Sequence, residues 1–169
     1  MTRRTKTYIA GDWDHDIELI DELYRRNNND YYALHFVDAH DLTQARDTDL
    51  PCSIKKSLAT RMDASKTFVL IVGDHTCALT KGSCQHCRRY SYGRCLGGQS
   101  ISRTSFIEYE CNKAVRDGLD IIVLYNSTSV DRSKCPETVR WLGQHEPAYD
   151  YVYGRGRVLR YQTIRRLLS

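Results

Sequence analysis

The sequence has no long apolar run, no signal-peptide core and no internal repeat. Nothing in it approaches the roughly 18 consecutive apolar residues of a membrane-spanning helix, so we expect no membrane contact. The basic start of the chain is not followed by the apolar core of a signal peptide, which predicts a cytoplasmic protein. The phosphate-binding patterns G-x-G-x-x-G after a strand and G-x-x-x-x-G-K-[ST] are also absent. Any phosphate must therefore be held by loop amides, helix ends or arginines.

The length and composition predict one globular domain. The chain has 169 residues, of which 41% are hydrophobic and 27% charged, and this is enough to bury a real core. We therefore expect residues 1–169 to form a single domain. The net charge of +4 suits an anionic small molecule, although a solvated basic surface is the commoner meaning of such a balance.

Apolar runs alternate with helix-period patterns along the whole chain. The expected strands are residues 6–10, 31–37, 67–73, 121–124 and 149–153. The expected helices are residues 17–24, 52–64, 105–117, 136–143 and 159–168. This alternation predicts an α/β fold with a parallel five-stranded sheet and helices on both faces. A ligand would then lie beyond the carboxyl ends of the strands.

Two carboxylates lie in the first turns of the helix expected at residues 105–117. Ser105 stands three residues before Glu108, which is the capping-box spacing, so Glu108 has a local structural role. Glu110 falls between Phe106 and Ala114 on the helical wheel, at the edge of the packed face. The helix dipole is one explanation for an early glutamate. A carboxylate at a packed edge is costly, however, unless it has a partner or a function.

The loops after the expected strands carry the remaining candidates. The candidate substrate-binding residues there are Gly11, Asp12, Trp13, Asp38 and His40. Each has a plain structural alternative, because acids in such loops cap helices or order turns and most loop histidines are not catalytic. We expect residues 11–16, 38–49 and 106–110 to converge on one cleft.

Four tracts of the sequence resemble the bacterial TIR-like family. They are TYIAGDWDHD, LHFVDAHDL, SIKKSLATRMDASKTFVLIVGDHT and SFIEYECNKAVRDGLDIIVLYN, and they span residues 6–126. Within that family, the chain is most similar to the ThsB proteins of Thoeris antiphage defence. The resemblance implies a flavodoxin-like, TIR-like sheet. TIR enzymes place an aromatic residue four positions before their catalytic glutamate, and Phe106 and Glu110 stand at that spacing.

The resemblance implies an NAD-consuming enzyme, either an NAD glycohydrolase or an ADP-ribosyl cyclase, that makes a cyclic ADP-ribose-type signal. Glu110 would be catalytic and Phe106 would bind the substrate. A fixed carboxylate in a poorly hydrated cleft stabilises the oxocarbenium-like ribose that forms when nicotinamide leaves. The implied partners are NAD and an effector protein reached through a diffusible nucleotide signal. A phage-derived trigger and a homo-oligomer are compatible with this interpretation.

Two alternatives stay open beside the NAD-consuming enzyme. One is a catalytically silent TIR-type interaction module. The other is a nucleoside deoxyribosyltransferase-like enzyme, which also uses a carboxylate at C1′. Two features depart from the family pattern: the aromatic residue is Phe106 where TIR enzymes often have tryptophan, and residues 75–101 form an insert that is longer than the connection in many relatives.

The insert (residues 75–101) is rich in cysteine. Seven cysteines in a chain without a signal peptide favour free thiols or a metal over disulfides. The C-x-x-C spacing of Cys84 and Cys87 is typical of zinc ligands. Three interpretations remain: reduced thiols packed against the domain, a redox role, or a structural zinc held by Cys77, Cys84, Cys87 and Cys95. The basic and aromatic residues of the insert suit the phosphates of NAD, a phage component, nucleic acid or a solvated loop.

Overall fold

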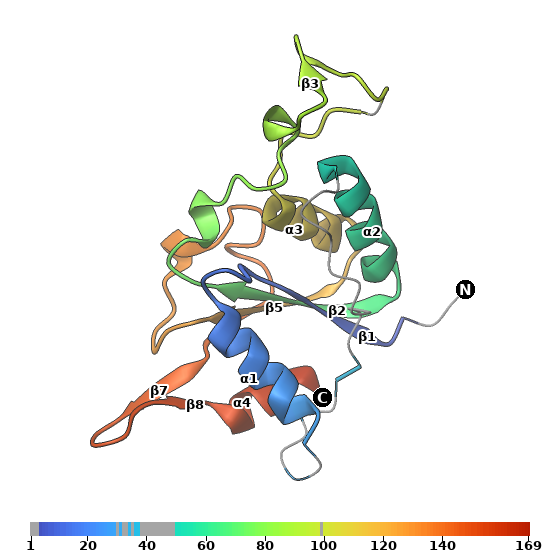
Figure 1. The fold of residues 1–169 in the computed structure, drawn as a ribbon. Helices are drawn as coiled ribbons and strands as arrows, with labels where there is room; N and C mark the ends of the chain where they lie inside the picture. Colours follow the sequence, from blue (N-terminus) through green and yellow to red (C-terminus); the bar gives the residue numbers. More distant parts are fainter. Residues whose placement is uncertain (1–3, 30, 32–33, 35, 38–49, 99) are drawn as a thin grey trace.

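A parallel sheet lies at the centre of the structure (Figure 1). The computed structural model describes residues 4–29, 31, 34, 36–37, 50–98 and 100–169. Four strands in the order β1-β2-β5-β6 make up this sheet. They are β1 (Lys6–Ala10), β2 (Ser65–Val72), β5 (Asp120–Tyr125) and β6 (Gln144–Pro147). The two inner strands are apolar and mostly buried, as expected when both faces of a parallel sheet are covered.

Helices cover both faces of the sheet. Helices α2 (Pro51–Asp63) and α3 (Phe106–Arg116) lie on one face, and α1 (Ile17–Asn27) and α4 (Tyr161–Leu168) lie on the other (Figure 1). Successive strand side chains point to opposite faces, so each strand contributes to both cores. Tyr8, Phe68 and Leu70 pack under α2 and α3, and Ile9, Val69 and Ile71 pack against α1 and α4. The prediction of an α/β parallel sheet covered on both faces is confirmed.

The expected fifth parallel strand at residues 149–153 is wrong. Strand β7 (Tyr149–Val152) instead pairs antiparallel with β8 (Gly156–Leu159) in a separate two-stranded sheet. The parallel neighbour of β5 is β6, whose sequence QHEP has no apolar pattern. This edge strand is held by backbone pairing, which a hydrophobicity pattern does not show.

The expected strand at residues 31–37 lies only partly within the described residues. Tyr31, Leu34, Phe36 and Val37 are described, and none of these four is in a strand. The amide of Thr7 donates a hydrogen bond to the carbonyl of Val37 over 2.7 Å, so Val37 lies at the free edge of β1. The described part of the chain therefore supports a four-stranded parallel sheet.

The helix expected at residues 136–143 is also wrong. A short 3-10 helix, η3 (Arg132–Lys134), is followed by turns whose amides bond to carbonyls three residues earlier. Side chains bond to backbone carbonyl groups in this segment and so compete with helical hydrogen bonds. Arg140 donates to the carbonyl of Cys135, and His145 Nε2 bonds to the carbonyls of Val139 and Leu142. The other expected helices are present as α1, α2, α3 and α4.

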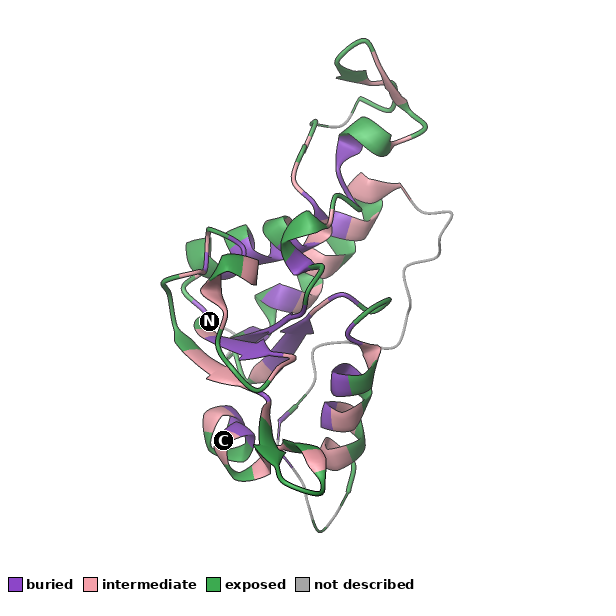
Figure 2. Ribbon diagram, turned by 90° about the vertical axis from the view of Figure 1, so that its left-hand side faces the viewer, coloured by how far each residue is buried: buried purple, intermediate pink, exposed green. Residues whose placement is uncertain are grey.

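The insert (residues 75–101) projects away from the sheet beyond α2 and α3 (Figures 1 and 2). It contains two 3-10 helices, η1 (Thr76–Ala78) and η2 (Cys84–His86), and a small hairpin formed by β3 (Tyr90–Ser91) and β4 (Arg94–Cys95). From Gln85 to Gly98 the described residues are all exposed or half-buried, as the green and pink tip in Figure 2 shows. The insert therefore extends beyond the two hydrophobic cores.

Within the described part of the chain, none of the helices has the length and apolar character that crossing a bilayer requires.

Candidate functional site

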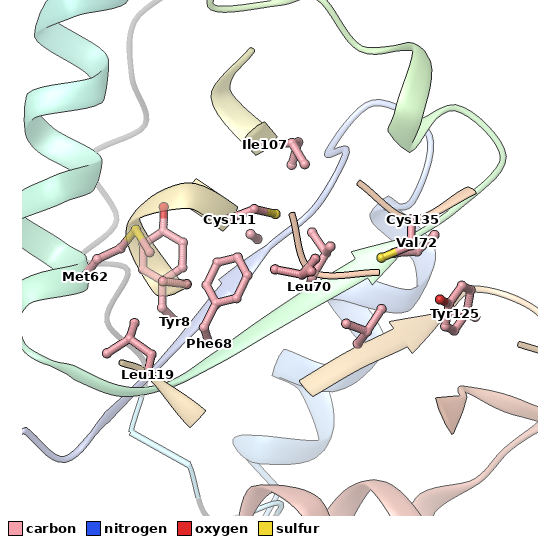
Figure 3. Packing of buried hydrophobic residues seen from close by; sticks show 14 residues of the cluster. Tyr8, Met62, Phe68, Leu70, Val72, Ile107, Cys111, Leu119, Tyr125 and Cys135 are labelled. Carbon is pink, nitrogen blue, oxygen red and sulfur yellow. The ribbon is translucent and has the colours of Figure 1, made fainter. Parts of the chain in front are cut away.

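Glu110 lies inside the molecule, between helix α3 and the sheet. Its side chain is only 5% exposed, and its carboxylate accepts a short hydrogen bond from the hydroxyl of Tyr8 on β1. Figure 3 shows the Tyr8 hydroxyl directed from the sheet toward the helix that carries Cys111. The Tyr8 ring stacks on Phe68 with 6.0 Å between the ring centroids, which fixes the donor in place. The carboxylate and its partner are thus held by two different elements.

Local sequence explains why Glu110 faces inward. Ser105 caps α3, since its hydroxyl accepts from the amide of Glu108 over 3.1 Å and its own amide donates to Glu108 Oε2 over 2.8 Å. This capping box fixes the start of the helix, as the sequence predicts. With the start fixed, Glu110 shares the buried side of α3 with Ile107 and Ala114, and Glu108 is exposed.

The environment of Glu110 brings the pKa of its carboxyl group close to neutral pH. Burial raises its pKa to about 7, while the hydrogen bond from Tyr8 and the charge of Arg61 oppose that rise. Burial, together with the negative charge of Glu110, raises the pKa of Tyr8 well above its usual value, so its hydroxyl stays protonated. A carboxyl group with this pKa can exchange a proton or stabilise a cation near neutral pH.

The insert covers the aromatic residue of the predicted motif. The amide of Phe106 donates to the carbonyl of Lys81 over 2.9 Å. Gly82 lies so close to the Phe106 ring that a Cβ atom there would be 2.5 Å from its Cδ1 atom. Phe106 is therefore half-buried beneath the first part of the insert and one helical turn from Glu110.

The loop after β1 holds three of the other candidates. Gly11 is half-buried and packs against Ile71 and Ile20. The buried Asp12 side chain accepts from the amide of Asp14 over 3.1 Å and bonds to His15 Nδ1 over 2.6 Å. Trp13 is 44% exposed and lies beside Tyr24. Asp38 and His40 lie outside the described residues.

A second polar cluster lies at the carboxyl ends of the strands, next to the loop after β1. Asp16, which is 3% exposed, accepts a hydrogen bond from the Asn126 side chain over 2.7 Å and lies directly over Gly73. Its Oδ2 atom is buried and has no hydrogen-bond partner among the residues that the structure describes. Burial raises the pKa of Asp16, against the effect of the Asn126 hydrogen bond. The loops after β1, β2 and β5 therefore meet where a ligand of a parallel sheet is expected.

The imidazole rings of His15 and His75 lie at the edge of this cluster, 4.3 Å apart between their centroids. The ammonium group of Lys81 is 3.6 Å from the Asp14 carboxylate, so the insert also contacts the loop after β1. These four side chains are exposed at the loops that follow β1 and β2.

Sequence reasoning missed several of these residues. Tyr8 reads as an ordinary strand residue, and its partner is 102 positions away. Asp16 stands at the N-cap position of α1, but its side chain forms no cap and bonds to Asn126 instead. The available signal for Asn126 was its place directly after the buried run of β5, at the expected ligand edge.

The structure separates the predicted metal ligands. Cys77 is exposed, and its thiol donates to the carbonyl of Lys134 over 2.8 Å. Cys84, Cys87 and Cys95 line a small cavity together with Cys52 of α2. As the described side chains stand, no three His, Cys, Asp or Glu residues already converge on a single metal position.

Comparison of the chain with known protein families and with curated proteins finds no match.

Proposed function

We propose that this protein is an NAD-consuming TIR-like enzyme, related to the ThsB proteins of Thoeris antiphage defence, with Glu110 as its catalytic carboxylate. The single observation that carries the proposal is the buried Glu110, whose pKa of about 7 is set by burial against a hydrogen bond from Tyr8. It stands four residues after Phe106 at the start of a capped helix, as the sequence resemblance requires. The proposed product is a cyclic ADP-ribose-type signal that reaches a separate effector.

The chemistry of the proposed reaction fits a buried carboxylate. Cleavage of the bond between C1′ of the ribose and the nicotinamide nitrogen sends the electron pair to nicotinamide and leaves a positive charge on the ribose. An ionised Glu110 in a poorly hydrated environment stabilises that charge far better than a solvated carboxylate would. Attack on C1′ by water completes hydrolysis, and attack by another atom of the same nucleotide gives the cyclic product. The half-buried Phe106 supplies a ring that can stack on a base.

The first test measures nicotinamide release from NAD by Glu110→Gln. This change keeps the side-chain shape and removes the charge, so we expect release to fall by roughly a hundredfold or more. Glu108→Gln is the matched control two residues away, because Glu108 serves the capping box. Its loss should cost about 1 kcal/mol of helix stability and leave the rate nearly unchanged. Products are separated by chromatography, and each variant is checked for its melting profile.

The same two variants show which result would contradict the assignment of Glu110 as the catalytic carboxylate. An inactive Glu108→Gln with an active Glu110→Gln would mean that the family motif has been placed on α3 in the wrong register. The assay uses conditions in which the wild type releases nicotinamide, with or without extract from phage-infected cells as a source of a trigger.

A second candidate function is a catalytically silent TIR-type interaction module. The observation that favours it is the poor solvent access of the two motif residues. Glu110 is 5% exposed, and the Phe106 ring is covered by Gly82. A wild-type protein that releases no nicotinamide with or without phage extract, yet binds a partner or itself, would select this alternative.

A further inference from the structure

A small cavity joins the insert to the start of helix α2. Six residues line it, four of which are cysteines: Cys52, Cys84, Cys87, Cys95, Tyr90 and Ser100. Its volume is about 10 Å³, which is roughly the space for a single water-sized sphere. Four cysteines from three separate parts of the chain thus line one small space. From these residues we propose that Cys52, Cys84, Cys87 and Cys95 form a structural tetrathiolate site for one Zn²⁺ ion.

The donor set decides the kind of metal. Four cysteine sulfurs without carboxylates select zinc among the common divalent cations, and structural zinc sites are four-coordinate and closed to substrate. The sulfurs of such a site lie roughly 3.8 Å apart, given zinc–sulfur bonds of about 2.3 Å. The described thiols do not yet meet that arrangement. Cysteine side chains reach new positions by rotation about one bond, and ligands of structural zinc take their final geometry together with the ion.

The backbone around Cys84 and Cys87 already has the shape of a metal-binding turn. The amide of Cys87 donates to the carbonyl of Cys84 over 3.0 Å, which closes the C-x-x-C loop. The amide of Arg89 donates to the sulfur of Cys87 over 3.4 Å, and the amide of Ser102 donates to the sulfur of Cys84 over 3.4 Å. Amide donors to sulfur stabilise the thiolate that a metal requires and orient it.

Cys95 reaches the cavity from the hairpin that follows this turn. Strand β4 places Cys95 opposite Tyr90 of β3, and the turn between them uses Tyr92 and Gly93, both with positive φ. The amide of Leu96 then donates to the carbonyl of Arg89 over 2.8 Å and closes the hairpin onto the turn. A turn with two cysteines and a hairpin with a third are thus fixed relative to each other by backbone bonds.

Cys52 completes the set from outside the insert. It lies in the first turn of α2, which has no acidic residue and, within the described residues, no side-chain cap, so the amides of that turn favour a thiolate. Pro51 at the start of the helix fixes where this turn begins. A metal bound here would tie the insert to α2.

A buried positive charge beside the cavity supports the same assignment. Lys55 is one turn after Cys52 and is 4% exposed. Its ammonium group donates to Ser102 Oγ over 2.8 Å and to the carbonyl of Thr104 over 2.7 Å. Within the described residues, no carboxylate lies within ion-pair distance of it, although the charge of Glu108 acts on it and the Tyr109 ring centroid is 5.6 Å from it. A zinc ion bound by four thiolates carries a net charge of about −2, which would add to the charge of Glu108 in offsetting this ammonium.

The insert also needs such a link for its own stability. The described residues of its tip belong to neither hydrophobic core, and Tyr92 and Leu96 are exposed. Segments too small to bury a core are commonly stabilised by a metal or by disulfides. The proposed site supplies that stabilisation, and it does not depend on the proposed reaction of Glu110.

The test compares Cys52→Ser with Cys77→Ser. Protein purified without chelator should contain about one equivalent of zinc, and binding should displace the thiol protons to solvent. Cys52→Ser should hold less than about a tenth of an equivalent, whereas Cys77→Ser should keep its zinc because that thiol bonds to the carbonyl of Lys134. Replacement of zinc by Co²⁺ should give the charge-transfer absorption of a tetrahedral thiolate site in wild type and Cys77→Ser only.

Three results would overturn the proposal. The first is a wild-type protein with less than about a tenth of an equivalent of metal and no Co²⁺ spectrum. The second is loss of zinc in Cys77→Ser with retention in Cys52→Ser. The third is a disulfide between any two of the four cysteines in freshly purified protein. If Cys52→Ser fails to fold by circular dichroism, Cys95→Ser replaces it, because Cys95 lies in the exposed hairpin away from both cores.

Discussion

At the scale of single residues, the burial of Glu110 opposes the charge that the proposed reaction needs. Its pKa is about 7 in the folded protein, against an ordinary value of 4.5. The folded state therefore keeps a proton that the unfolded chain has lost between these two pH values. This group's contribution to the free energy of unfolding is fully present below pH 4.5 and is lost as the pH rises through about 7. The loss is on the order of 3 kcal/mol.

Glu110→Gln should remove this pH dependence, because glutamine stays neutral. We expect the free energy of unfolding of the variant to exceed that of wild type by a growing margin between about pH 5 and pH 8. Urea unfolding of both proteins at several pH values measures the margin. Glu108→Gln, which removes a charge from the exposed side of the same helix, is the control. Parallel pH profiles of Glu110→Gln and wild type would contradict the burial of a protonated carboxyl group.

In the proposed reaction, Tyr8 would be a positioning residue whose role shows in the pH profile of nicotinamide release. Its hydrogen bond lowers the pKa of Glu110, so Tyr8→Phe should raise that pKa above about 7. If ionised Glu110 is the active form, kcat/KM for nicotinamide release should then reach its half-maximal value at a higher pH than in wild type. Activity should recover toward the wild-type value at alkaline pH.

The matched control is Tyr125→Phe. The Tyr125 hydroxyl bonds to His145 Nδ1 over 2.9 Å in the same core, without contacting Glu110. This variant should leave the midpoint of the pH profile unchanged. A loss of activity in Tyr8→Phe that is equal at every pH would mean that Tyr8 acts through packing alone.

At the scale of elements, the contact between the insert and α3 depends on a glycine. Gly82 has φ +101° and lies against the Phe106 ring, where an added Cβ would be 2.5 Å from ring atoms. Gly118 at the end of α3 also has positive φ, +66°, but a Cβ there would meet nothing within 4 Å. Alanine at either position costs roughly 1 kcal/mol through the backbone. Only Gly82→Ala adds overpacking, which costs about 1–3 kcal/mol.

We therefore expect Gly82→Ala to lower the free energy of unfolding more than Gly118→Ala does. Chemical unfolding monitored by circular dichroism measures both values. Increased exposure of Phe106 should accompany the change and can be followed by hydrogen exchange of the first turn of α3. Equal costs for the two variants would mean that the insert does not rest on Phe106 in solution.

Elements with strong local signals could be predicted from the sequence. The capping box of α3 is formed by Ser105 and Glu108, which are three residues apart in the sequence. The apolar runs of β2 and β5 predict buried strands. Strand β6 could not be predicted, because its residues are mostly polar and it is held in the sheet by backbone pairing with β5. The turns at residues 136–143 depend on side chains of Arg140 and His145, which compete for carbonyl groups.

At the scale of the whole molecule, the sequence could predict which carboxylate lies at the packed face of α3, but not which residue would form a hydrogen bond with it. The place of Glu110 between Phe106 and Ala114 on the helical wheel predicts a carboxylate at the edge of the packed face, while its donor Tyr8 comes from the first strand. The same limit applies to the cysteines. Cys84 and Cys87 are neighbours in sequence, but Cys52 joins their cavity only because α2 packs next to the insert, and Cys77 is held elsewhere by the carbonyl of Lys134.

The two cores and the insert should also be separable. Leu79 of the insert packs against one of the cores as a partly buried residue, and none of the described residues in the range 85–101 belongs to either core. The amide of Cys84 donates to the carbonyl of Ser102 over 2.8 Å, so the two ends of this segment lie side by side. A short linker of about four glycine and serine residues can bridge such a gap.

Replacement of residues 85–101 by this linker should leave a folded α/β domain. We expect cooperative unfolding with a midpoint within about 4 °C of metal-free wild type, because the change then removes little buried apolar surface and no bound metal. Circular dichroism and thermal unfolding provide the measurement. Leu70→Ala in the centre of the sheet is the control for sensitivity, since truncation of a fully buried leucine costs about 2–5 kcal/mol. A shortened chain that is insoluble or unfolds without cooperativity would show that the insert is part of the folding unit.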